Sequence, residues 1–293
     1  GHIDTVWPVG TLREIPFSVA EGVVRGPGVF DMKAGAAVAF SVLERLASRS
    51  GSPRVTLLLV PDEEVGSAAS HDLLIRLAKQ HERVLVLEPS APGGAAKIAR
   101  KGTGQFRVLF KGVPAHAGLE PEKGASALAA LAEFVQASPG FASAPFGTTV
   151  TPTLAQAGSK ANVVPEFAEV TLDCRVWSPE EPARVEAALR AFRPSDPRVR
   201  LEIEGGFDRP PLAETDASRR LFATAREIAA GLGFELRGER VGGASDGNLS
   251  AAAGVPTLDG LGPLGDGAHA RHEHVVLADL ARRADLIERL VLA

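Results

Sequence analysis

Two short apolar runs constrain the fold of this chain more than any other feature. Residues 55–60 and 84–87 are almost wholly aliphatic and lack the polar alternation of a strand with one wet face. Such runs are typical of parallel strands buried on both faces. The segment 67–80 between them and the Ala-rich segment 33–48 before them both have apolar residues at helical spacing. This succession predicts an α/β layer with a mainly parallel central sheet.

The middle of the chain has a different rhythm. Residues 104–111 alternate like a half-buried strand. Together with the segments that follow it up to residue 208, this strand gives the order β-α-β-β-α-β. This order is the split pattern of a ferredoxin-like α+β layer. The α/β rhythm then resumes and ends in an amphipathic helix. We therefore expect one domain formed by residues 1–100 and 209–293, interrupted by an inserted domain of residues 101–208.

Composition excludes several classes of function. The net charge is −4 and no basic stripe is visible, so no nucleic-acid partner is expected. The apolar stretches are short and interrupted, so no membrane span is expected. Cys174 is the only cysteine, which excludes an internal disulfide and a thiolate-rich metal site. Any metal ion must therefore be held by His, Asp and Glu.

The start of the sequence carries a separate expectation. It opens at Gly1 without an initiator methionine, and it shows no signal peptide. We therefore expect a fragment or a processed form of a longer protein, with the cytoplasm as its compartment.

Acidic residues follow both apolar runs directly. Glu63 and Glu64 come just after the first run, and Glu88 comes just after the second. Loop carboxylates are usually only solvated. However, ligands of open parallel sheets bind at the carboxyl ends of the strands, and here two strands bring acids to the same edge. The coincidence predicts a cation site there.

Four other residues become interesting only in combination with these acids. His2 and Asp4 lie two apart at a strand end, so Asp4 could fix the tautomer of His2, although such pairs are more often solvated. Asp31 precedes a predicted helix, where an N-cap is its usual role. His269 lies in a loop with two further histidines that also resembles a surface cluster.

Together these residues form a set of two histidines and several carboxylates at one predicted sheet edge. Such a set suits two divalent metal ions, with zinc preferred and cobalt or manganese as alternatives. A pair of ions can activate a water for attack on a carbonyl, and the spare glutamate of the Glu63–Glu64 pair would move protons.

The chain also resembles a known family. Its motifs are similar to those of the co-catalytic zinc peptidases and deacylases, which include glutamate carboxypeptidases, acetylornithine deacetylases and succinyl-diaminopimelate desuccinylases. The matching motifs are His2-Ile3-Asp4-Thr5, Gly26-Pro27-Gly28 with Asp31, Asp62-Glu63-Glu64, Glu88-Pro89, His116-Ala117-Gly118, Asn162-Val163-Val164-Pro165 with Arg175, Gly242-Gly243-Ala244-Ser245-Asp246, and His269 with Glu273. They run in register through the whole chain.

The resemblance implies a role for each site residue. One metal ion would take His2 and Glu88, the other Glu64 and His269, and Asp31 would bridge them. Asp4 would orient His2, and Glu63 would act as general base and acid. The substrate contacts would be His116, Asn162, Arg175, Arg209 and Ser245.

The resemblance also implies architecture and activity. The inserted domain would be a lid and would form a homodimer, with His116 often acting in a neighbouring subunit's site. The family's catalytic domain begins before its histidine motif, so its N-terminal part would be absent here. The implied reaction is hydrolysis of an amide bond next to a free carboxylate in a small peptide or N-acyl amino acid, as in glutamate carboxypeptidases.

Three alternatives remain open at this point. The first is an N-acyl amino acid deacylase of the acetylornithine or succinyl-diaminopimelate type. The second is a truncated, non-catalytic dimeric binding module. The third, nucleotide binding through Gly26-Pro27-Gly28, is weak because the remaining glycine spacing is lacking.

Overall fold

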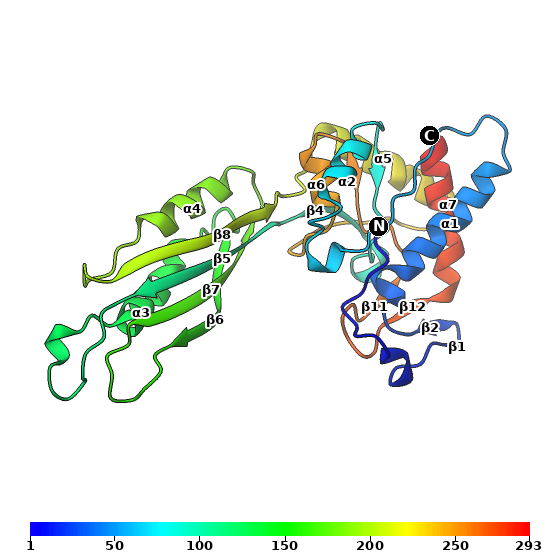
Figure 1. The fold of residues 1–293 in the computed structure, drawn as a ribbon. Coiled ribbons are helices and arrows are strands. Elements are labelled where there is room, and N and C mark those ends of the chain that lie inside the picture. The colour runs from blue at the N-terminus through cyan, green and yellow to red at the C-terminus, as the bar shows by residue number, and fades with distance from the viewer. The chain divides into compact units, whose positions relative to one another are not determined.

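The computed structural model describes the whole chain, residues 1–293, which divides into two compact units (Figure 1). Unit 1 consists of Gly1–Arg100 and Leu212–Ala293, and unit 2 consists of Lys101–Pro211. Unit 1 is therefore discontinuous in sequence. None of the helices is both long and apolar enough to cross a membrane.

Five α-helices belong to unit 1. They are α1 (Ala34–Ala47), α2 (His71–Ala78), α5 (Asp216–Gly231), α6 (Gly247–Ala252) and α7 (Leu277–Leu292). The helix predicted over 33–48 is α1, and its apolar positions Val38, Val42 and Leu46 are buried in the main core. Helix α7 contributes Leu286 and Leu290 to the same core. The predicted amphipathic faces thus pack against each other.

The paired strands of unit 1 are mixed rather than mainly parallel. Strand β3 (Val84–Leu85) is parallel to β10 (Thr257–Leu258), and β4 (Ala96–Arg100) is parallel to β9 (Gly238–Val241). The other four strands form an antiparallel sheet in the order β1-β2-β12-β11. Their bounds are Ser18–Ala20 for β1, Val23–Arg25 for β2, Gly265–Asp266 for β11 and His274–Val276 for β12. This small sheet has no counterpart among the predicted elements.

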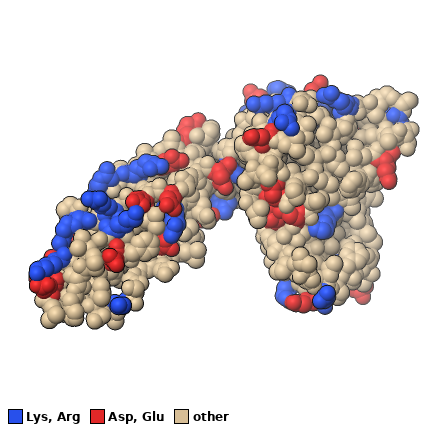
Figure 2. All heavy atoms as spheres, in the orientation of Figure 1, with Lys and Arg blue, Asp and Glu red and all other residues tan.

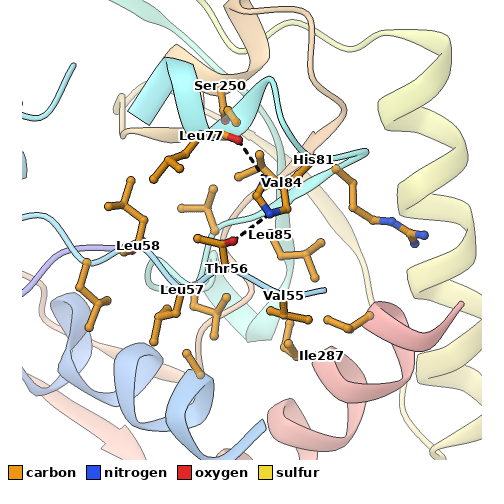
Figure 3. Close-up of a pocket in the computed structure, with 18 of the residues that line it drawn as sticks. Val55, Thr56, Leu57, Leu58, Leu77, His81, Val84, Leu85, Ser250 and Ile287 are labelled. Carbon is orange, nitrogen blue, oxygen red and sulfur yellow. Dashed lines mark hydrogen bonds between the residues drawn. The ribbon is translucent and has the colours of Figure 1, made fainter. Parts of the chain in front are cut away.

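The first apolar run departs most from its prediction. Residues 55–59 belong to no strand, and only Val60 forms a bridge, with His2. Val60 is buried, but Val55 is 38% exposed, so burial on both faces was wrong for most of this run. Residues 55–59 instead line a cavity of about 480 Å³ together with Leu77, Leu85 and Ile287 (Figure 3). The strand predicted over 234–237 is also absent, because β9 begins only at Gly238.

Unit 2 has the predicted order of elements. It runs through β5 (Gly102–Lys111), α3 (Ala127–Ala137), β6 (Thr149–Ala157), β7 (Phe167–Val176), α4 (Glu181–Ala191) and β8 (Arg200–Arg209). The strands form one antiparallel sheet in the order β6-β7-β5-β8. Short 3-10 helices occur in both units, at Thr11–Arg13, Glu63–Val65, Pro92–Gly94, Pro121–Lys123 and Ser138–Gly140.

The two faces of β5 explain how this sheet is covered. Phe106, Val108 and Phe110 alternate into the core, as predicted. On the other face Leu109 is buried, but Arg107 and Lys111 are exposed and pair across strands, and Lys111 Nζ lies 2.6 Å from Glu202 Oε1. In Figure 2, acidic side chains lie among the basic ones on the visible face of this unit.

Phe134 provides a test of the core of unit 2. Its ring is fully buried and lies 5.6 Å, 5.4 Å and 5.0 Å from the ring centroids of Phe110, Phe141 and Phe192. The Phe134→Ala change should lower the free energy of unfolding by about 3–5 kcal/mol, because it leaves a cavity among these rings. Denaturant unfolding would measure this. Phe146→Ala is the matched control: Phe146 is 59% exposed, so its loss should change stability by no more than about 0.5 kcal/mol.

Candidate metal centre

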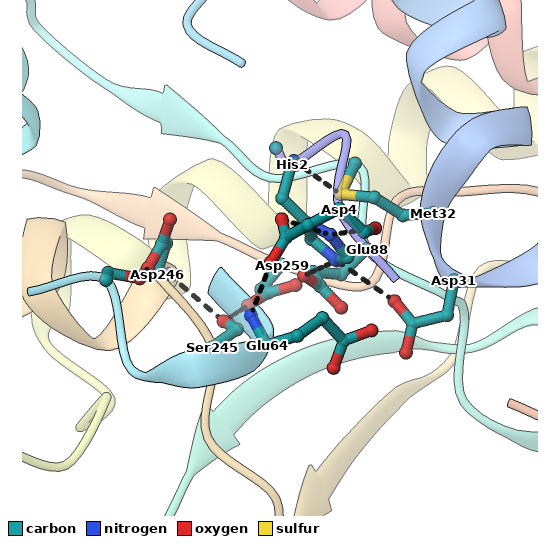
Figure 4. A network of polar contacts seen from close by, with 12 residues as sticks. His2, Asp4, Asp31, Met32, Glu64, Glu88, Ser245, Asp246 and Asp259 are labelled. Atoms are coloured by element: carbon teal, nitrogen blue, oxygen red, sulfur yellow. Dashed lines mark hydrogen bonds and ion pairs between the residues drawn. The ribbon is translucent and has the colours of Figure 1, made fainter. Parts of the chain in front are cut away.

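Loops at the ends of short elements bring the predicted ligands together (Figure 4). His2 lies beside Val60, and Glu64 is in the turn Glu63–Val65 that follows it. Asp31 lies in an irregular π-helical turn, η2 (Val29–Lys33), and its backbone angles are not helical. The N-cap of α1 is Lys33, so Asp31 is not the helix cap that its position suggested.

The carboxylate of Asp31 lies between two imidazoles. His2 Nε2 is 3.1 Å from Asp31 Oδ1, and His269 Nε2 is 3.2 Å from Asp31 Oδ2. Each carboxylate oxygen thus faces one histidine. This is the arrangement expected of a residue that bridges two cations.

Each imidazole also meets a second carboxylate. His2 Nε2 lies 3.3 Å from Glu88 Oε1, and His269 Nε2 lies 3.2 Å from Glu64 Oε2. These pairs are the ones that the family resemblance implies. Glu63 lies close by as well, since one carboxylate oxygen of Glu63, one of Glu88 and a ring nitrogen of His2 all lie within 4.8 Å of one another.

Asp4 fixes the orientation of His2. The other ring nitrogen, Nδ1, lies 3.1 Å from the backbone oxygen of Asp4 and 3.4 Å from its Oδ1. In the neutral ring a proton on Nδ1 is directed to Asp4, which leaves the lone pair of Nε2 for a cation. Asp4 Oδ2 also accepts a hydrogen bond from the backbone N–H of Glu64 at 3.0 Å, so Asp4 connects two of the converging segments.

Burial and neighbouring charges shift the pKa values of His2 and Glu64. Burial by itself lowers the pKa of His2, but hydrogen bonds to Asp31 and Glu88 outweigh burial and raise that pKa from 6.5 to about 11. Burial raises the pKa of Glu64, and the charge of Asp31 adds to the rise. Both shifts agree with a buried site in which carboxylates surround the imidazole of His2.

The donor set fits a pair of divalent cations. Glu64 Oε1 is buried and accepts no hydrogen bond, which is costly for a carboxylate oxygen unless a cation contacts it. The donors are imidazole nitrogens and carboxylate oxygens without thiolate, as suits zinc, manganese or cobalt.

A buried ion pair lies behind the ligands, and the sequence did not point to it. Arg100, only 3% exposed, donates from Nε to Asp259 Oδ2 at 2.7 Å and from Nη2 to Oδ1 at 3.1 Å. Its Nη2 also lies 3.8 Å from Glu88 Oε2. Asp259 directly follows the strand predicted over 255–258, just as Glu88 follows 84–87, so the same rule would have identified it.

Lys97, on the same strand β4, was also missed. Its pKa is lowered by burial first and by the charge of Arg100 second, while Asp259, Glu88 and Asp31 act in the opposite direction. The amine therefore lies in the field of the site carboxylates.

Ser245, an expected substrate contact, lies in unit 1. It is fully buried, and its hydroxyl donates to Asp259 Oδ2 at 2.5 Å. Its amide N–H donates to Asn248 Oδ1 at 3.0 Å. Ser245 thus takes part in the buried network around Asp259.

The other expected substrate contacts all belong to unit 2. His116 and Asn162 are exposed and lie on adjacent segments, where the amide N–H of Ala117 donates to Asn162 O at 3.0 Å. Arg175 and Arg209 both lie opposite Thr103, one on each side of β5. Arg175 makes a two-point contact with Asp173, with both distances 2.8 Å, and Arg209 is buried.

A comparison with protein-family models shows the family of this chain. The model of peptidase family M20/M25/M40 matches residues 1–293. The chain belongs to this family. Its members in the comparisons below identify it as a hydrolase that acts on C–N bonds.

Curated relatives and a solved structure agree with this assignment. Carboxypeptidase G2 of Pseudomonas sp. (strain RS-16) is 30% identical over 304 residues, covering 99% of this chain and 72% of the relative. A succinyl-diaminopimelate desuccinylase of Alkalilimnicola ehrlichii is 32% identical over 303 residues, covering 96% and 79%. Aminopeptidase PepT of Bacillus cereus shares the fold, with a TM-score of 0.79 at 23% identity over 99% of this chain and 78% of that one.

The Arg100–Asp259 pair can be tested within this M20-family chain. Arg100→Met should lower the free energy of unfolding by about 3–5 kcal/mol, because it leaves the Asp259 carboxylate buried without its countercharge. Adding Asp259→Asn should recover part of the loss. Lys111→Met is the control, since its pair with Glu202 is about half exposed and should contribute less than about 1 kcal/mol. Equal effects of the two single changes in denaturant unfolding would contradict this account.

Proposed function

We propose that this chain hydrolyses an amide bond next to a free carboxylate, with two divalent metal ions at the cluster around Asp31. Zinc is the preferred ion. His2 and Glu88 would hold one ion and Glu64 and His269 the other, with one oxygen of Asp31 toward each. The observation that carries the proposal is the contact of both imidazoles with the two oxygens of a single carboxylate. When bound, such ions polarise the scissile carbonyl and lower the pKa of a water between them.

The side chain of Glu63 would then transfer the proton of the attacking water. Glu63 neighbours the ligand Glu64 and lies in the turn Glu63–Val65, close to His2 and Glu88. We assign Glu63 to take the proton from the attacking water and to deliver it to the leaving amine. Asp4 would keep the His2 ring in the tautomer that leaves Nε2 free.

Unit 2 would act as a ferredoxin-like lid and dimerisation domain. We propose that His116, Asn162, Arg175 and Arg209 contact the substrate, with the guanidinium groups suited to its carboxylate. Strand β6 is an edge strand of the sheet, and Leu154 on it is 70% exposed. An edge strand with an exposed leucine suits pairing with a second copy, so we propose a homodimer through this edge.

The substrate class has two candidates, each with a curated relative. Similarity to carboxypeptidase G2 favours release of glutamate from an N-acyl-glutamate, and similarity to succinyl-diaminopimelate desuccinylase favours removal of a succinyl group. We place the first ahead because the match to carboxypeptidase G2 covers 99% of this chain. Parallel assays of both substrates would separate them.

Glu63 gives the sharpest test of catalysis. Glu63→Gln should lower kcat by roughly 10²–10⁴-fold, because the amide cannot accept the proton of the water. Zinc content by elemental analysis should stay unchanged. Glu44→Gln, an exposed change on α1, is the control and should leave kcat unaltered. A zinc-loaded protein without turnover on any N-acyl amino acid would instead favour a binding module.

Metal removal should weaken the fold of unit 1. With the ions absent, the carboxylates around the two imidazoles lack countercharge. We expect free zinc at 100 times its Kd to stabilise the protein by about 2.7 kcal/mol for each site. Thermal unfolding with and without a chelator would measure this. The proposal fails if the unfolding midpoint does not respond to zinc and elemental analysis finds no bound metal.

A further inference from the structure

Glu273 is a buried carboxylate that the proposed chemistry does not use. It is 2% exposed. Its Oε1 accepts hydrogen bonds from the backbone N–H groups of Phe30 at 2.9 Å and Asp31 at 3.0 Å. Its Oε2 accepts from the backbone N–H of Gly28 at 2.7 Å and from the indole N–H of Trp7 at 3.0 Å. A single side chain therefore accepts four N–H groups.

These bonds join the segments that carry the candidate ligands. Trp7 follows the segment with His2 and Asp4, and the three backbone donors include Asp31 itself. On its own segment, the N–H of Glu273 donates to Ala270 O at 3.0 Å and closes the turn that presents His269. His269 has a φ of 63°, in the left-handed region, so this turn holds the residue in an uncommon conformation.

The bond between Glu273 and the Asp31 amide acts directly on the central carboxylate. It fixes the backbone of the residue whose two oxygens face the two imidazoles. The neighbouring Gly28 has a φ of 75°, and a Cβ there would lie 2.4 Å from Thr5 Cγ2, so the loop is already closely packed against the first segment. A shift of the loop at Glu273 would thus change the Asp31–His269 separation.

We propose that Glu273 is a positioning residue that sets the separation of Asp31 and His269 and thereby the affinity of the cation site between them. The inference rests on the proposed metal centre. The positioning role requires that the Glu273 side chain accept from all four N–H groups, those of Trp7, Gly28, Phe30 and Asp31. A glutamine would offer one acceptor oxygen, and its NH₂ group would face N–H donors.

The test is a metal titration of Glu273→Gln. Zinc affinity would be measured by chelator competition on the full chain, and cobalt would serve as a spectroscopic probe of ligand geometry. We expect one of the two sites to weaken by roughly 10–100-fold, with an altered cobalt absorption band. Trp7→Phe removes only one donor and keeps the carboxylate, so a smaller change in the same direction is expected even if Glu273→Gln folds poorly.

The control separates positioning from a general loss of stability. Glu181→Gln makes the same change at a glutamate of unit 2 that is 5% exposed and bonded to Thr148 and Arg184. It should lower the unfolding midpoint and leave both zinc affinities within about threefold of the parent.

The outcomes distinguish this inference from the proposed function. Two bound ions in the parent and unchanged affinities in Glu273→Gln and Trp7→Phe would overturn the positioning role alone. A parent that binds no zinc would overturn the metal centre and with it this inference. Equal loss of affinity in Glu181→Gln would also overturn the positioning role, because the effect would then follow stability.

Discussion

The carboxylate of Asp31 is the point on which this molecule depends. Its two oxygens lie 3.1 Å and 3.2 Å from ring nitrogens of two histidines that are far apart in the sequence. Each histidine is in turn within reach of another glutamate. Negative charge at such density is unfavourable in a buried place unless cations balance it, and the raised pKa of His2 reflects that demand.

The buried carboxylate of Asp259 is also balanced by a positive charge, that of Arg100. Arg100 and Asp259 form a two-point pair with almost no exposure, and the backbone oxygens of Gly243 and Ala244 accept the remaining bonds of the guanidinium. Such a pair adds little net stability over apolar packing, yet it is costly to break from one side. Its value here is geometric, because Arg100 also lies beside Glu88.

The sequence predicted the long elements well and the short ones poorly. Helices α1 and α7 and the elements of unit 2 are nine or more residues long, which lets their periodicity be read. Strands β1, β2, β11 and β12 are two or three residues long, which is too short for any alternation to be visible. The run 55–60 has the composition of a central strand, but only Val60 has a paired neighbour, and composition cannot show whether a neighbour exists.

The sequence predicted more of the candidate site than of the strands around it. The acids after residues 60 and 87 were informative because they follow apolar runs, and the family motifs supplied Asp31 and His269. What pattern could not supply was the set of contacts behind the ligands. The pairing of Arg100 with Asp259 and the bonds of Glu273 to the backbone of Gly28, Phe30 and Asp31 depend on tertiary structure. The motif that contains Ser245 likewise did not reveal that its side chain is fully buried.

The discontinuity of unit 1 has a consequence for biosynthesis. His2, Asp31, Glu64 and Glu88 emerge from the ribosome early, whereas His269 and Glu273 follow only after the whole of unit 2 and two further helices. A nascent chain therefore holds an incomplete set of the candidate ligands until unit 2 and helices α5 and α6 have been synthesised. The candidate metal centre therefore assembles only after unit 2 has been translated, so the order of translation itself delays its completion.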